Sequence, residues 1–106
     1  MLTLSLYKDN DNLIVLDSLY DQGAGAYIND ATVTITLTDS ADEEVSGQSW
    51  PLTLSYVSDS NGKYQGVVDA DAALTAGARY LADITAERGT LKGRWKFVAI
   101  CRDRVV

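Results

Sequence analysis

The segment that decides the fold class is Thr32–Thr38, which reads Thr-Val-Thr-Ile-Thr-Leu-Thr. Apolar and hydroxyl side chains alternate strictly along it, and every residue except Leu37 is β-branched. This pattern is typical of a β-strand with one face against a core and the other toward solvent. We therefore expect Val33, Ile35 and Leu37 to be buried. The threonines between and beside them are expected to form an outer, soluble face: Thr32, Thr34, Thr36 and Thr38.

Further segments with the same period of two flank this one, at the spacing of about 8–12 residues that short strands show in all-β domains. The predicted strands are 2–7, 13–16, 32–38, 52–56, 64–68, 80–86 and 91–100. Turn-forming residues separate them, including Asn61-Gly62 and Arg88-Gly89-Thr90. The first two strands are expected to pair as a hairpin around the polar run 8–12.

Three short segments lie outside this strand pattern. Residues 23–26, Gly-Ala-Gly-Ala, are expected to be a flexible loop between strands. Residues 41–45 and 71–75 have room for one helical turn at most, which is too short for a stable helix.

Seven short strands in 106 residues predict an all-β chain that folds as one domain over residues 1–106. The strand count and spacing favour an immunoglobulin-like antiparallel β-sandwich of about seven strands. We expect the following core: Leu13, Val15, Val33, Ile35, Leu37, Trp50, Leu52, Leu54, Tyr64, Val68, Leu74, Tyr80, Ala82, Ile84, Trp95 and Phe97.

The segment Leu74–Tyr80 supports the immunoglobulin-like prediction. It places Gly77 shortly before an aromatic residue at the start of a strand. The ring of Tyr80 is expected to pack in the core while its hydroxyl bonds back to the preceding corner. The alternative is a buried tyrosine that simply follows a turn.

Composition excludes several kinds of catalytic and metal site. The chain has no His and one Cys, so it has no Ser-His-Asp triad, His metal ligand, intrachain disulfide or multi-Cys zinc site.

Asp9-Asn10-Asp11-Asn12 resembles the start of a calcium loop, but Ile14 and Tyr20 stand where that loop needs Gly and Glu. The acidic run 39–44 is more typical of a solvated turn than of a cation site. Cys101 has cationic neighbours but no base to activate it. We expect no enzymatic activity, no cofactor and no metal.

Charge is divided unevenly along the chain, whose net charge is −6. Residues 1–87 carry three cations and fourteen acids, whereas residues 88–106 carry six cations and one acid. Either the basic segment lies beside acidic strands of its own fold, or it forms an interaction surface. The predicted protein interface consists of Arg94, Lys96, Arg102, Arg104, Val105 and Val106.

Nucleic acid is disfavoured as the partner of this basic segment. Alternation directs Trp95 and Phe97 to the core, so they are on the face opposite to Arg94 and Lys96 and cannot stack on bases beside those cations. The acidic charge of the whole chain also repels phosphates.

A membrane location is not expected. The N-terminal residues lack a cationic start followed by an apolar run, and no stretch approaches the roughly 20 apolar residues of a spanning helix. Synthesis in the cytoplasm, where a lone thiol stays reduced, fits this pattern.

Five segments together resemble a known group of proteins: Asn29–Thr34, Trp50–Leu54, Asn61–Gly66, Leu74–Tyr80 and Gly93–Trp95. In this order, after an N-terminal pair of strands, they are similar to the small immunoglobulin-like structural proteins encoded among the head genes of tailed bacteriophages. The resemblance covers nearly the whole chain and rests on turn and core residues. It implies a virion protein made in the host cytoplasm, a capsid decoration or minor capsid protein that binds the outer shell in many copies and reinforces it. The implied partners are the major capsid protein or other virion proteins, and a homo-oligomer, preferably a trimer, is expected. No catalytic residue is carried over.

Two alternatives remain open at this level. One is a head–tail connector or tail component, which would form a ring. The other is a carbohydrate- or cell-surface-binding module that uses Tyr7, Tyr20, Tyr27 and Tyr56 in loops or at strand ends. Oligomeric state distinguishes these classes.

Overall fold

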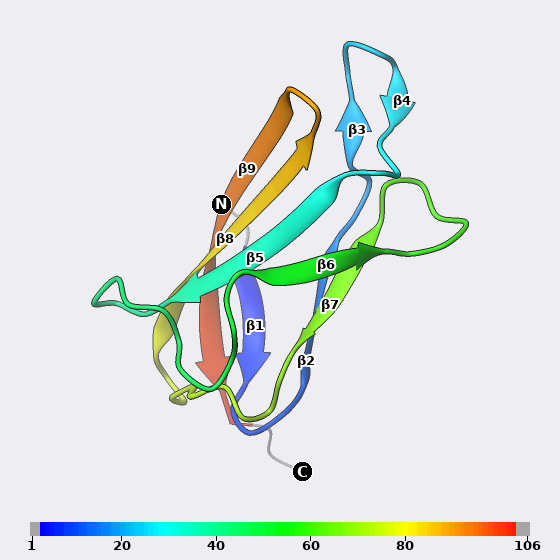
Figure 1. Ribbon diagram of the computed structural model, residues 1–106. Coiled ribbons are helices and arrows are strands. Elements are labelled where there is room, and N and C mark those ends of the chain that lie inside the picture. Colours follow the sequence, from blue (N-terminus) through cyan, green and yellow to red (C-terminus); the bar gives the residue numbers. More distant parts are fainter. Residues whose placement is uncertain (1–2, 104–106) are drawn as a thin grey trace.

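Every regular element of the computed structural model, which describes residues 3–103, is a β-strand (Figure 1). This part of the chain contains no helix, so the prediction of an all-β fold is confirmed, and the segments 41–45 and 71–75 form turns and bends. The strands are β1 (Thr3–Tyr7), β2 (Asn12–Leu16), β3 (Tyr20–Asp21), β4 (Ala26–Tyr27), β5 (Thr32–Thr38), β6 (Leu52–Tyr56), β7 (Tyr64–Val68), β8 (Arg79–Arg88) and β9 (Leu91–Arg102).

Seven of these strands form one mixed sheet in the order β1-β9-β8-β5-β6-β7-β2. All neighbours are antiparallel except β1 and β9, which run parallel. Strand β6 is shared along its length, because Leu52–Leu54 pair with β5 while Ser55 and Tyr56 pair with β7. The sheet therefore curls until it is nearly barrel-like (Figure 1).

The expected hairpin between the first two strands is wrong. β1 pairs with β9 and β2 pairs with β7. The reason is the side chain of Asn12, which is 5% exposed. Its Oδ1 accepts a hydrogen bond from the amide of Tyr7 at 2.9 Å, and its Nδ2 donates to the Tyr7 carbonyl at 3.0 Å. Asn12 therefore holds the corner between β1 and β2 in place. From this corner the two strands run to different neighbours, β9 and β7.

The core prediction from the 32–38 segment is confirmed. Val33, Ile35 and Leu37 are each 0% exposed. The same alternation holds in β8, whose inward residues Tyr80, Ala82, Ile84 and Ala86 are buried. Leu54, Tyr64, Val68 and Leu74 are buried as expected, and Trp50, Leu52, Trp95 and Phe97 pack half-buried against the same cluster.

The register predicted for the second strand is wrong by one residue. Leu13 and Val15 are 57% and 41% exposed, and Ile14 takes the core position instead. Residues 13–16 are all apolar, so alternation alone does not tell which face is inward. The buried side chain of Asn12 sets the choice, because every second residue from it points to the same face.

Two of the predicted turns are present, together with one additional hairpin. Asn61-Gly62 and Gly89-Thr90 connect antiparallel strands, as predicted. Residues 23–26, expected to be a loop between strands, lie at the turn of a small separate hairpin, β3–β4, whose two short strands were not predicted. This hairpin and the turn of β8–β9 project from the same end of the molecule (Figure 1).

Candidate functional site

The basic segment lies mainly on strand β9, and its two faces differ as predicted. Trp95 and Phe97 pack half-buried against the core, whereas Arg94 and Lys96 point outward and are exposed. Trp95 and Phe97 therefore do not share a surface with Arg94 and Lys96.

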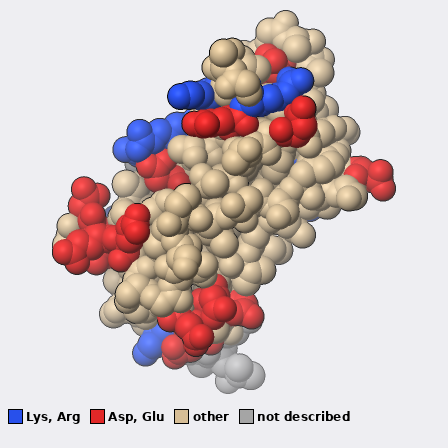
Figure 2. Space-filling view, in the orientation of Figure 1, with Lys and Arg blue, Asp and Glu red and all other residues tan. Residues whose placement is uncertain are grey.

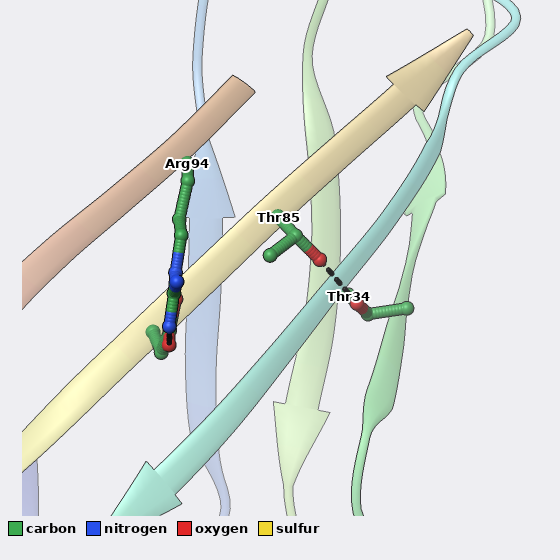
Figure 3. A network of polar contacts seen from close by, with 4 residues as sticks. Thr34, Thr85 and Arg94 are labelled. Carbon is green, nitrogen blue, oxygen red and sulfur yellow. Dashed lines mark hydrogen bonds and ion pairs between the residues drawn. The ribbon is translucent and has the colours of Figure 1, made fainter. Parts of the chain in front are cut away.

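Two cations of this segment are paired with acids of the same domain. Arg94 makes a two-pronged contact with Asp83 of β8, with Nε 3.0 Å from Oδ1 and Nη2 2.6 Å from Oδ2 (Figure 3). Arg88 Nε lies 2.8 Å from Asp30 Oδ1. Pairing within the fold thus accounts for part of the charge division seen in the sequence.

The pair with Arg94 changes the titration of Asp83. The hydrogen bond from Arg94 lowers the pKa of the Asp83 carboxyl, and the charges of Arg94 and Lys96 act in the same direction against the opposing effect of burial. Lys96 lies directly opposite Asp83 in the β8–β9 register. Asp83 therefore stays ionised in an environment of two cations.

The structure brings three of the predicted interface residues onto one face. Arg94, Lys96 and Arg102 are all exposed and share the outward side of β9 by parity. Arg104, Val105 and Val106, also predicted for the interface, lie outside the described residues.

Sequence reasoning missed the apolar residues between these cations. Val98 and Ile100 alternate in phase with Arg94, Lys96 and Arg102 on the outward side, and Leu81 of β8 lies opposite Val98. All three are half-buried, and they are not among the described residues that pack against the buried core cluster. The period of two, continued past Lys96, could have identified them.

Hydroxyl groups extend the same outward face across β8 and β5. Thr34 Oγ1 and Thr85 Oγ1 are 2.9 Å apart and hydrogen-bonded (Figure 3). The broad surface in the view of Figure 2 is largely uncharged, and its acidic and basic side chains gather at the rim. We call the outward side of β5, β8 and β9 the threonine face. It combines neutral hydroxyls, an apolar strip and cations.

The four tyrosines proposed for ligand binding do not form one site. Tyr20 and Tyr27 are 46% and 45% exposed and meet edge to face across β3–β4, with ring centroids 5.1 Å apart. Tyr56 is half-buried, packs on Tyr64 and donates its hydroxyl to the Ser60 carbonyl. Tyr7 is half-buried at the end of β1.

A cleft of about 270 Å³ opens beside Tyr20. Its walls come from segment 19–31 and from the β8–β9 hairpin, including Trp95 and Leu91. No sequence pattern indicated it, because its two walls are more than fifty residues apart in the chain.

The remaining candidates from the sequence are the lone cysteine, a metal site and a membrane span. Cys101 is 1% exposed, and burial, with the charge of Asp103, raises the pKa of its thiol. Residues 3–103 contain no cluster of three or more His, Cys, Asp or Glu side chains arranged to hold a metal. No helix in the described part of the chain is long and apolar enough to cross a membrane.

Comparison with known proteins gives no relative. No protein-family model, curated protein or solved structure matches this chain.

Proposed function

We propose that this chain is a non-enzymatic virion structural protein, a capsid decoration or minor capsid protein that uses the threonine face to bind its neighbours. The observation that carries this proposal is the strip along β9, where half-buried Val98 and Ile100 lie between exposed cations. Apolar residues at the centre with charged residues around them are the usual anatomy of a protein interface.

An immunoglobulin-like β-sandwich is the form we propose for this module. Strands β1, β9, β8 and β5 would form one layer and β2 and β7 the other, with β6 passing from one to the other. The hydrogen bond from the Thr75 amide to the Tyr80 hydroxyl supports this, because such a corner precedes a central strand in immunoglobulin-like domains.

Charge on the threonine face favours an acidic neighbouring surface. Arg94 is neutralised by Asp83, but Lys96 and Arg102 form no ion pair among residues 3–103. A single exposed ion pair is worth only about 0–1 kcal/mol. Binding to a shell in many copies multiplies such weak contacts. The proposed partners are the major capsid protein or other virion proteins, and a trimer is the favoured oligomer.

The proposal is tested by sedimentation equilibrium of the full chain and of two matched variants. Val98→Asp places a charge in the centre of the threonine face, whereas Val67→Asp places it on β7, at a side chain that is 47% exposed. We expect a trimer for the wild type and for Val67→Asp, and a folded monomer for Val98→Asp. Unchanged association of Val98→Asp would place the interface elsewhere. A ring of six or twelve copies would instead support the head–tail connector.

A second candidate is a carbohydrate- or cell-surface-binding module. The cleft beside Tyr20 favours it, since this exposed ring borders a concave, mainly apolar site. Saturable binding of a glycan by a monomeric chain would support this function over assembly.

A further inference from the structure

The cleft between the two projecting hairpins has a fixed wall. The amide of Leu19 donates to the Gly62 carbonyl, and the amide of Ile28 donates to the Leu19 carbonyl, each at 2.9 Å. Leu19 and Ile28 are both 8% exposed. The base of the β3–β4 hairpin is therefore bonded to the main body, and the cleft does not depend on a loose loop.

Small residues create the hollow on the opposite wall. Ala86 of β8 lies directly opposite Gly93 of β9, and both line the cleft. The indole of Trp95 lies over Gly93, so closely that a Cβ added at Gly93 would be 2.7 Å from Trp95 Cη2. The six-membered ring of Trp95 therefore packs against Gly93 and also lines the cleft. It offers an extended apolar surface to the cleft.

The mouth of the cleft carries both signs of charge. Asp21 and Arg88 stand among its lining residues, and Arg88 is also paired with Asp30. Asp21 is held in place because its Oδ1 accepts hydrogen bonds from the amides of Gly23 and Ala24. Asp21 and Arg88 carry opposite charges, so a charged ligand gains little from the mouth, whereas a neutral ligand with donors and acceptors can use both kinds of group.

We infer that this cleft binds the ring of a neutral sugar, which names the site and the ligand for the binding-module function proposed above. A pyranose has an apolar C–H face for the indole of Trp95 and a rim of hydroxyls that donate to the Asp21 carboxylate and accept from Arg88. The volume of about 270 Å³ lies just below the range of roughly 300–1,000 Å³ typical of larger ligands, which fits a single ring.

The binding test uses the full chain labelled with ¹⁵N and the methyl glycosides of glucose, galactose, mannose and N-acetylglucosamine. Each is added to about 100 mM, because single-ring ligands often bind only in the millimolar range. We expect saturable shifts of the Trp95 indole N–H and of amides in segments 19–23 and 86–93 with at least one sugar. The Trp50 indole, whose Nε1 donates to the Val45 carbonyl at 2.7 Å, is the internal control. No saturable shift with any of the four sugars, or shifts away from the cleft, would overturn the inference.

Two leucine variants locate the binding. Leu91 lines the cleft and is 45% exposed, while Leu13, on β2, is 57% exposed and does not line it. We expect Leu91→Ser to weaken sugar binding about tenfold, as the loss of part of an apolar contact does, and Leu13→Ser to leave it unchanged. Equal binding by both variants would contradict the assigned site.

Sugar binding by the cleft is tested independently of assembly through the threonine face. Val98→Asp, designed as a monomer, leaves the cleft intact and is expected to bind the sugar as the wild type does. A chain that assembles but binds no sugar disproves the cleft alone, and a chain that binds sugar without assembling disproves the capsid role alone.

Discussion

The hydroxyl of Tyr80 accepts a hydrogen bond from the backbone amide of Thr75 at 2.7 Å. Between them Gly77 turns the chain with φ of 84°, and its amide donates to the carbonyl of Cys101 at 2.9 Å. The corner before β8 is therefore bonded both to the strand that it starts and to β9. It should behave as a rigid part of the fold.

Tyr80→Phe is expected to lower the free energy of unfolding by about 1–3 kcal/mol, because it removes the acceptor of the Thr75 amide while the ring stays buried. Urea titration followed by circular dichroism measures the change. Tyr27→Phe is the control, since that ring is 45% exposed, and a change below about 0.5 kcal/mol is expected for it. Equal effects of the two variants would mean that the corner does not contribute to stability.

Gly62→Ala is expected to destabilise the protein much more than Gly77→Ala. Both glycines have positive φ, 71° and 84°, so both variants carry the backbone cost of about 1–3 kcal/mol for that conformation. Only at Gly62 would the new Cβ meet the Leu19 backbone, with its carbonyl oxygen 2.4 Å away, whereas at Gly77 it meets nothing within 4 Å. Thermal unfolding of the two variants measures the difference. Similar melting temperatures would show that the backbone at Leu19 moves away from the new Cβ with little loss of stability.

Asp83→Asn is expected to reduce stability at neutral pH and to have less effect in acid. The folded state lowers the pKa of Asp83 below its ordinary value of 3.8, so its pairing stabilises the protein fully above that value and is lost as the pH falls through the lower, folded-state pKa. Urea midpoints between pH 7 and pH 2 measure this. Asp59→Asn, in the exposed turn after β6, removes the same charge without removing an ion pair of the described residues. The prediction would be contradicted if the urea midpoints of Asp83→Asn and Asp59→Asn differed as much at pH 2 as at pH 7.

Cys101 is expected to resist thiol reagents in the folded protein. It is 1% exposed, so a reagent rarely reaches the sulfur. Burial also raises the pKa of its thiol, so little of the reactive thiolate is present. Reaction with Ellman's reagent at neutral pH should be slower by about 100-fold or more than in denaturant, because it needs local opening. Ser5→Cys in a Cys101→Ala background gives an exposed thiol on the neighbouring strand β1 as a control. Equal rates for the two thiols would show that the end of β9 opens freely.

Local patterns were sufficient to predict an all-β chain but not all strand partners. Residues 32–38 and 80–86 alternate so cleanly that only one face can be buried, and the structure agrees. Residues 13–16 are apolar on both faces, so their orientation depends on the buried side chain of Asn12, five residues from the Tyr7 backbone that it binds. A polar residue that acts through hydrogen bonds to the backbone of a nearby corner leaves no periodic trace in the sequence.

The candidate site was predictable only where it lies within one strand. Alternation separates the outward cations of β9 from Trp95 and Phe97. The pairing of Arg94 with Asp83 depends on the register of β8 and β9, and the cleft depends on how segment 19–31 folds back onto the β8–β9 hairpin. These relationships arise from the arrangement of distant segments, which spacing along the chain does not encode.

Parallel pairing of β1 and β9 has a mechanical consequence. Thr3 lies opposite Val98 and Tyr7 opposite Arg102, so force that draws Thr3 and Arg102 apart pulls the two strands in opposite directions along their length. The evenly spaced bonds of this parallel ladder are then loaded together in shear instead of opening one after another. Resistance to such a pull is governed by the rate of forced unfolding rather than by equilibrium stability. Anchored at these two points, the domain would hold under tension as a tether.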